Sequence, residues 1–202
     1  MSNFGNMFSM AGASLILPFL PMLPVQILLN NLLYDLSETP IPMDEVDPEA
    51  MAAPPHWDIG FIRNFMLVLG PVSSLFDFLT FGLLLLVFGA GPALFQTGWF
   101  IESLATQVLV IFVIRTRRNP LQSRPSPYLA AAAIGVVALA ILIPFTALGR
   151  WFGFVAPPPA LLAALAVMLV CYLVLAEVVK RWFYRHRPPE GRARAWVRGR
   201  FG

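Results

Sequence analysis

The stretch VQILLNNLLYDLSETPIP, residues 25–42, places several polar side chains within an otherwise apolar run. On a helix of 3.6 residues per turn, Asn31 and Asp35 lie one turn apart and form one column. Gln26, Asn30 and Tyr34 form the neighbouring column. Because an ionised carboxylate in hydrocarbon costs roughly 2.5–3.5 kcal/mol on insertion scales, Asp35 is expected to face protein, water or an ion.

A second polar pair precedes this stretch, since Asn3 and Asn6 in SNFGNMF are three residues apart and share a helix face. The link between the two segments is short and contains three prolines, so it predicts that they lie side by side and antiparallel. The resulting cluster of amides and a carboxylate suits a hard cation, Mg²⁺ or Ca²⁺. The alternative is hydrogen bonding between helices, at about 0.6 kcal/mol for each polar residue.

The composition indicates a membrane protein. Of the 202 residues 58% are hydrophobic and 12% are charged, and the mean hydropathy is +0.72. The single cysteine provides no disulfide framework and no thiolate metal site. We therefore predict an all-α polytopic membrane protein with about six transmembrane helices, and we disfavour a soluble enzyme or a nucleic-acid binder. The six expected spans are 3–20, 22–38, 64–90, 94–114, 128–147 and 159–178.

Two of the later spans carry polar faces. In the third span Asp77 lies on a stripe with Ser73 and Thr80, which can satisfy its hydrogen bonds, so we interpret it as structural. In the fourth span Glu102 shares a polar face with its neighbours. Glu102 could complete the cation site or hold helices together, and the sequence leaves both interpretations open.

The basic residues predict the orientation. If the loop at 115–127 and the tail at 185–202 are both cytoplasmic, the two spans between them return the chain to the same side, and both chain termini face the cytoplasm. The tail is expected to contact anionic lipid headgroups. Glu177 is expected to form helix ion pairs with Lys180 and Arg181.

Several segments carry a family resemblance. SNFGNMFS (2–9), PFLPMLPVQILLNNLLYDLS (18–37) and WDIGFIRNFMLVLGPVSSLFDFLTF (57–81) resemble the C-terminal membrane region of the bacterial magnesium-translocating P-type ATPases. The resemblance implies that the chain runs from the end of transmembrane helix five through helix ten, with a membrane domain at 1–184 and a basic tail at 185–202.

The resemblance also implies a cation site. Asn3 and Asn6 match the helix-five polar positions of the SNxGN pattern, and Asn31 and Asp35 match the ends of the helix-six NLxxD motif. Together with Glu102, these are the candidate metal-binding residues. A site with amides and few carboxylates favours Mg²⁺ over Ca²⁺ modestly, because Mg²⁺ keeps several of its waters.

The implied function is the cation-pathway part of a magnesium-transporting ATPase in the bacterial inner membrane, with Mg²⁺ as the transported ion. The implied partners are the lipid bilayer and the remaining cytoplasmic and N-terminal membrane parts of the pump. The sequence contains no Asp-Lys-Thr-Gly phosphorylation motif, so ATP would be used only through domains outside this chain, which is not catalytic on its own. Two alternatives stay open: a truncated membrane protein acting as a scaffold or regulator, and a passive cation channel.

Overall fold

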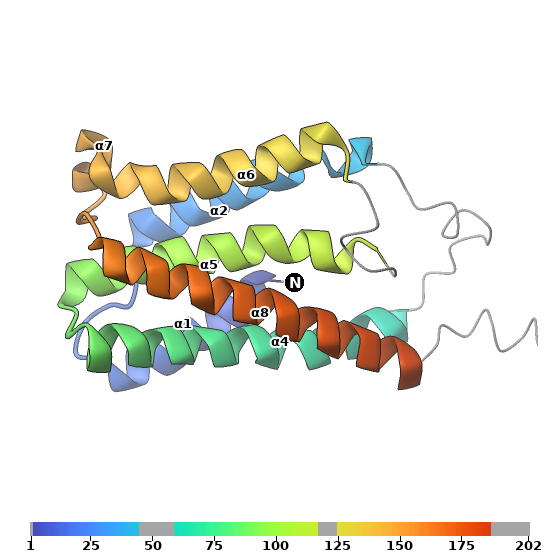
Figure 1. Cartoon of the computed structure of the whole chain (residues 1–202). Coiled ribbons are helices and arrows are strands. Elements are labelled where there is room, and N and C mark those ends of the chain that lie inside the picture. The colour runs from blue at the N-terminus through green and yellow to red at the C-terminus, as the bar shows by residue number, and fades with distance from the viewer. Residues whose placement is uncertain (1, 45–58, 117–124, 187–202) are drawn as a thin grey trace, which may run out of the picture.

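The computed structural model describes residues 2–44, 59–116 and 125–186, and every regular element in these ranges is helical. The prediction of an all-α membrane fold is thereby confirmed. Figure 1 shows the helices as a bundle of roughly parallel and antiparallel rods. The elements are α1 (Ser2–Ile16), α2 (Pro24–Glu38), η1 (Ile41–Met43), α4 (Ile59–Gly82), η2 (Leu83–Val87), α5 (Pro92–Ile114), α6 (Pro127–Leu142), η3 (Ile143–Phe145), α7 (Ala147–Trp151) and α8 (Pro159–His186).

Four helical stretches among the described residues are long and apolar enough to cross a membrane: Arg63–Val87, Pro92–Ile114, Pro127–Phe145 and Pro159–Arg185. The helices α1 and α2 have only 15 residues each. At 1.5 Å per residue each is about 22 Å long, less than the roughly 30 Å of hydrocarbon in a bilayer. The structure therefore supports four of the six expected spans by length, and the crossings predicted at 3–20 and 22–38 stay predictions.

Prolines explain where several helices begin. The helices α2, α5, α6 and α8 all start at a proline, a residue that lacks an N–H and is preset for the first turn of a helix. The first helix stops at Ile16, before the proline-containing segment 17–23, because proline disfavours helical backbone at the residue before it.

The helix α5 is the centre of the bundle. Within its most apolar window, 78% of the residues are buried inside the protein, against 17–33% for the other three candidate spans. It packs against α2, α4, α6 and α8. Its Phe95, Trp99 and Phe100 are fully buried, and Phe81 of α4 meets Trp99 edge to face, with ring centroids 4.9 Å apart. Because α5 has neighbouring helices on several sides, its buried polar residues can reach more than one of them.

The predicted side-by-side packing of the first two segments is wrong. The helix α1 packs against α4, whereas α2 packs against α6 and α5, and Figure 1 shows α1 near α4 and α2 behind α6. The physical reason is the length of the link. The seven residues 17–23 span up to about 23 Å when extended, whereas the axes of packed helices are 8–10 Å apart. The link is therefore long enough for α1 and α2 to pack against different neighbours.

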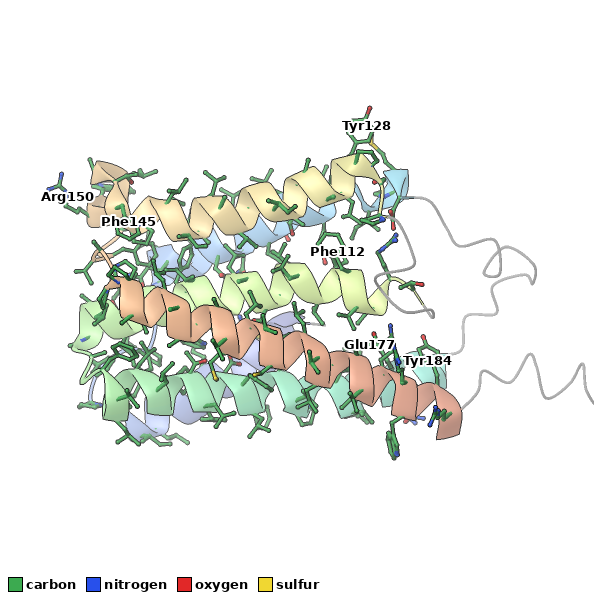
Figure 2. The ribbon with its side chains drawn as sticks, in the orientation of Figure 1. Phe112, Tyr128, Phe145, Arg150, Glu177 and Tyr184 are labelled. Carbon is green, nitrogen blue, oxygen red and sulfur yellow. The ribbon has the colours of Figure 1, made fainter. Side chains whose placement is uncertain are left out.

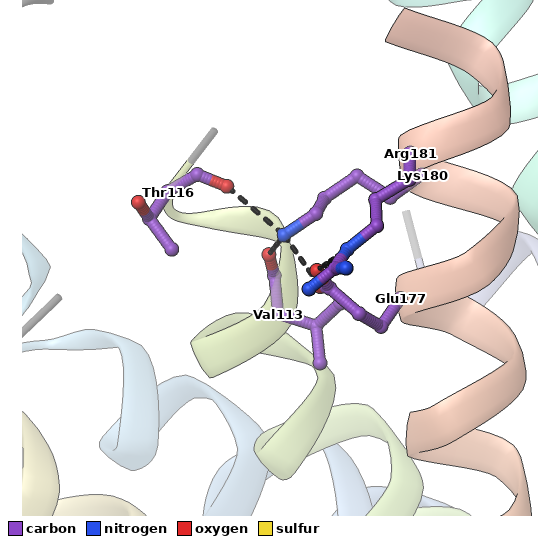
Figure 3. Close-up of polar contacts among 5 residues, drawn as sticks. All are labelled: Val113, Thr116, Glu177, Lys180 and Arg181. Atoms are coloured by element: carbon purple, nitrogen blue, oxygen red, sulfur yellow. Dashed lines mark hydrogen bonds and ion pairs between the residues drawn. The ribbon is translucent and has the colours of Figure 1, made fainter. Parts of the chain in front are cut away.

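The helix α8 continues beyond the expected end at residue 178, as far as His186. Its Lys180 is buried, so the helix stays packed on the bundle beyond the expected end of the span. The predicted ion pairs are confirmed, since Glu177 lies 2.6 Å from Lys180 Nζ and 2.7 Å from Arg181 Nε (Figure 3). Most of the predicted tail lies outside the described residues, so the division at residue 184 stays a prediction.

One end of the bundle is tied together by Asp44, the residue after η1. Its carboxylate pairs with Arg115 at the end of α5, and it also accepts a hydrogen bond of 2.8 Å from the backbone N–H of Ser126. The Ser126 hydroxyl in turn accepts from the N–H of Leu129 and caps α6. Three chain segments thus meet at one partly buried carboxylate.

Gly149 in α7 provides a stability prediction at the other end of the bundle. A Cβ at this position would lie 2.1 Å from the carbonyl oxygen of Ile143 and 2.8 Å from Cα of Pro144. Because both are backbone atoms, Gly149→Ala should destabilise the protein by about 1–3 kcal/mol in denaturant titration in detergent. Gly135→Ala on α6, where the added methyl group meets nothing within 4 Å, is the matched control and should be neutral or mildly stabilising. Equal stability of the two variants would contradict the close approach.

Candidate functional site

The two columns predicted on α2 have different environments. Gln26 and Asn30 are buried, and Gln26 Nε2 donates a 3.0 Å hydrogen bond to the carbonyl oxygen of Phe152. In the other column Asn31 is half-buried and Asp35 is exposed. Large apolar side chains are exposed on the same helix at Leu28, Leu32 and Leu36. A carboxylate within an otherwise apolar exposed surface is costly in lipid, so this face of α2 is suited to contact with another protein segment, water or an ion.

Of the two candidate ligands on α1, Asn6 contacts α5 rather than α2. Asn6 Nδ2 donates a 2.6 Å hydrogen bond to Ser103 Oγ, and the same oxygen accepts a 2.9 Å bond from Gln107 Nε2. Asn3 belongs to α1, but its side chain lies outside the described residues. The structure thus brings Asn6 to the residue next to Glu102, at the centre of the bundle.

Glu102 faces Asp77 of α4. The two carboxyl groups lie close enough to interact, and the side chains are 3% and 1% exposed. Asp77 Oδ2 accepts a 2.5 Å hydrogen bond from the hydroxyl of Ser9 on α1, and its Oδ1 accepts a 3.1 Å bond from Trp99 Nε1 on α5. Three helices therefore converge on one buried carboxyl pair.

The local interpretation of Asp77 needs correction. The groups that bond it are Ser9 and Trp99, not Ser73 and Thr80 on its own helix. The Ser73 side chain lies close enough to interact with Tyr172 of α8, and the buried Thr80 hydroxyl has no hydrogen-bond partner within the described part of the chain. Side chains on the neighbouring helices α1 and α5 thus supply the hydrogen bonds of this carboxylate.

Sequence reasoning missed two members of this network. Ser9 lies three residues after Asn6 and so shares its face of α1, a spacing that could have identified it. Trp99 precedes Glu102 by three residues on α5, but its aromatic character indicated core packing rather than a hydrogen bond to a carboxylate. On α2, the buried Asn30 has an Oδ1 that accepts no hydrogen bond from any described residue.

The polar side chains at this site carry the ligand atoms that hard cations prefer. Amides, hydroxyls and carboxylates supply oxygen, and hard divalent cations prefer oxygen. Within the described ranges no group of three or more His, Cys, Asp or Glu residues could hold a metal ion. A cation here would rely on a carboxylate pair, or on one carboxylate with amides, and on retained waters.

These features define a class: an α-helical membrane protein whose bundle interior holds carboxyl and amide groups contributed by several helices, the arrangement of ion-transporting membrane proteins. Residues 19–182 match the family model of the cation transporting ATPase C-terminus. Because this match covers most of the chain, the protein belongs to that family.

The similarity to curated proteins supports the same family assignment. The chain is 43% identical over 189 residues to the magnesium-transporting ATPase, P-type 1 of Salmonella typhimurium (strain LT2) and 42% identical over 189 residues to the protein of the same name from Escherichia coli (strain K12). Each alignment covers 91% of this chain and 21% of the relative. The chain therefore spans about a fifth of the length of the curated relatives it matches.

Proposed function

We propose that this chain is the C-terminal membrane part of a P-type ATPase that transports Mg²⁺, and that it supplies cation-pathway residues to that pump. The observation that carries the proposal is the identity of 42–43% that extends over 91% of the chain. Since the relatives are five times longer, ATP hydrolysis would be performed by regions that this sequence does not contain. The supporting geometry is the half-buried Asn6 of α1 and Asn31 of α2 and the buried Glu102 of α5.

The proposed cation ligands are Asn3 and Asn6 on α1, Asn31 and Asp35 on α2, and Glu102 on α5. Asp35 is the exposed carboxylate of this set, and the apolar residues around it support contact with a further transmembrane segment of the pump. The partner at this face would complete the ligand set from outside the chain. Amide oxygens and few carboxylates suit Mg²⁺, which keeps waters in its coordination shell.

The proposed orientation places both chain ends on the cytoplasmic side of a bacterial inner membrane. The described basic residues Arg63, Arg115, Lys180, Arg181 and Arg185 lie toward the end of the bundle where α4 begins and α5 and α8 finish. Figure 2 shows Arg150 at the opposite end from Glu177 and Tyr184. This asymmetry supports the orientation through the positive-inside rule. The basic residues beyond α8 would then meet anionic headgroups.

A chimeric pump tests the proposed function. In a bacterial magnesium-transporting ATPase, the matching C-terminal membrane region is replaced by this chain, and Mg²⁺ uptake is measured in inverted or right-side-out vesicles with and without ATP. We expect ATP-dependent Mg²⁺ uptake, since the two regions share 42–43% identity. The unmodified pump and a chimera without its phosphorylated aspartate are the controls.

Three outcomes of that experiment would contradict the proposal. A chimera that reaches the membrane and moves another cation but not Mg²⁺ would refute the assigned ion. Mg²⁺ flux that does not depend on ATP would favour a passive channel. A membrane-inserted chimera that hydrolyses ATP without moving any cation would favour a scaffold or regulator.

A further inference from the structure

We propose that Asp77 and Glu102 form a second binding position for a divalent cation between α4 and α5, which shares Glu102 with the ligand set proposed above and lies apart from Asn31 and Asp35 on α2. The position would take Mg²⁺ or another hard divalent cation. This inference rests on the proposed function for the identity of the natural cation, while the binding position itself follows from the side chains.

The first step is the arrangement of the carboxyl oxygens. Asp77 accepts one hydrogen bond on each oxygen, from Ser9 and from Trp99, as an ionised carboxylate does, and a carboxylate with about four lone-pair sites keeps acceptor capacity beyond these two bonds. Glu102 contacts Asp77, but its Oε2 is buried and has no hydrogen-bond partner. A buried oxygen without a partner costs free energy, and a bound cation would remove that cost.

The second step is charge. Two ionised carboxylates in contact repel each other, and burial of an unpaired charge is strongly unfavourable. Among the described residues, the ion pairs join Asp44 with Arg115, and Glu177 with Lys180 and Arg181, so none of them compensates Asp77 or Glu102. A proton shared between the two groups would leave one negative charge and would occupy a single oxygen of Glu102. A divalent cation would neutralise both charges.

A nearby hydroxyl supports the same position. Thr80 follows Asp77 by three residues and lies on the same face of α4. Its hydroxyl oxygen is fully buried and has no hydrogen-bond partner among the described residues. The face of α4 that carries Asp77 thus also carries a buried hydroxyl oxygen without a partner, and hydroxyl and carboxylate oxygens are both ligand types that Mg²⁺ accepts.

The position differs from the column on α2 in its surroundings. Asp35 is exposed and sits on α2, which packs against α5 and α6. Asp77 and Glu102 are buried between α4 and α5, and Ser9 of α1 bonds Asp77 from a third helix. A cation at the carboxyl pair would therefore be held by ligands within this chain, whereas the column on α2 is open to an additional segment.

The test is a Mn²⁺ titration of the 202-residue chain in lipid nanodiscs, with free Mn²⁺ followed by electron paramagnetic resonance and with Mg²⁺ as competitor. Mn²⁺ shares the preference of Mg²⁺ for oxygen ligands. Asp77→Asn and Glu102→Gln should each weaken binding by about 100-fold or more, because loss of a direct ligand exceeds the 10–100-fold typical of outer partners. Ser9→Ala should weaken it by roughly tenfold.

A matched control separates this position from other effects of substitution. Ser14→Ala on α1 removes a hydroxyl that bonds the carbonyl oxygen of Met10 and should leave the Mn²⁺ affinity unchanged. Because neither ATP nor transport enters the measurement, a chimera that fails to carry Mg²⁺ would not affect this result.

The proposal is overturned if the wild-type chain binds no Mn²⁺ that Mg²⁺ displaces, or if Asp77→Asn and Glu102→Gln bind as the wild type does. Either result would indicate a carboxyl pair held by a proton alone. Circular dichroism checks that each variant keeps its helices. If Asp77→Asn loses them, the comparison of Ser9→Ala with Ser14→Ala decides, and equal affinities would refute the position.

Discussion

Asp35→Ala is expected to abolish ATP-driven Mg²⁺ uptake by the chimeric pump. Asp35 is the exposed carboxylate on α2, and it lies one helical turn from Asn31. Removing it would delete the negative charge from the proposed ligand set on that helix, and a site of amides alone would not compensate the dehydration of Mg²⁺. The initial rate of uptake is measured at saturating ATP, together with the amount of pump in the membrane.

Neighbouring substitutions make this prediction specific. Leu32→Ala changes an exposed apolar residue of the same helix and should keep uptake close to that of the unmodified chimera. Asp35→Asn preserves the size of the side chain and should lose uptake as well if the charge is what matters. Uptake that persists in Asp35→Ala would remove this residue from the cation pathway, whatever the fate of the other proposed ligands.

The pattern on α2 shows what periodicity can predict. The sequence predicts Asn31 and Asp35 in one column and Gln26, Asn30 and Tyr34 in the next. In the structure Gln26 and Asn30 are buried, Tyr34 is half-buried and Asp35 is exposed. The helical repeat alone decides which residues share a face. The predicted spans overlap the observed helices because prolines mark several starts and long apolar runs mark the extents, although α1 ends earlier and α8 ends later than expected.

Helical periodicity does not predict the contacts between helices. The pairing of Glu102 with Asp77 depends on the rotation and axial register of α5 against α4, and periodicity within one helix does not determine either. The separation of α1 from α2 depends on the path taken by residues 17–23. Asp77 was thus assigned to local partners, although its hydrogen bonds come from α1 and α5.

The contacts of Lys180 predict the largest stability effect in the bundle. Its Nζ donates hydrogen bonds to the carbonyl oxygens of Val113, at 2.8 Å, and Thr116, at 3.2 Å, and it pairs with Glu177 on its own helix (Figure 3). The last carbonyl groups of a helix have no partners within it, and a cation near them is favourable. The side chain is 1% exposed, so water does not replace these contacts.

Lys180→Met keeps a long side chain but removes the ammonium group, and it should lower the free energy of unfolding by about 3 kcal/mol. That value is the lower end of the range for breaking a buried ion pair, because Glu177 keeps its bond to Arg181. Arg181→Met is the matched control. The Arg181 side chain is 54% exposed, and a surface pair contributes less than about 1 kcal/mol. Denaturant titration in detergent compares the two variants.

The difference between these variants distinguishes two roles for the charged end of α8. If Lys180→Met is far less stable than Arg181→Met, the ammonium group fixes the end of the central helix α5 to α8, and with it the depth at which Glu102 and Ser103 are presented. If both variants are equally stable, the bonds to Val113 and Thr116 contribute little, and the apolar packing of α8 on α5 is sufficient to hold that end.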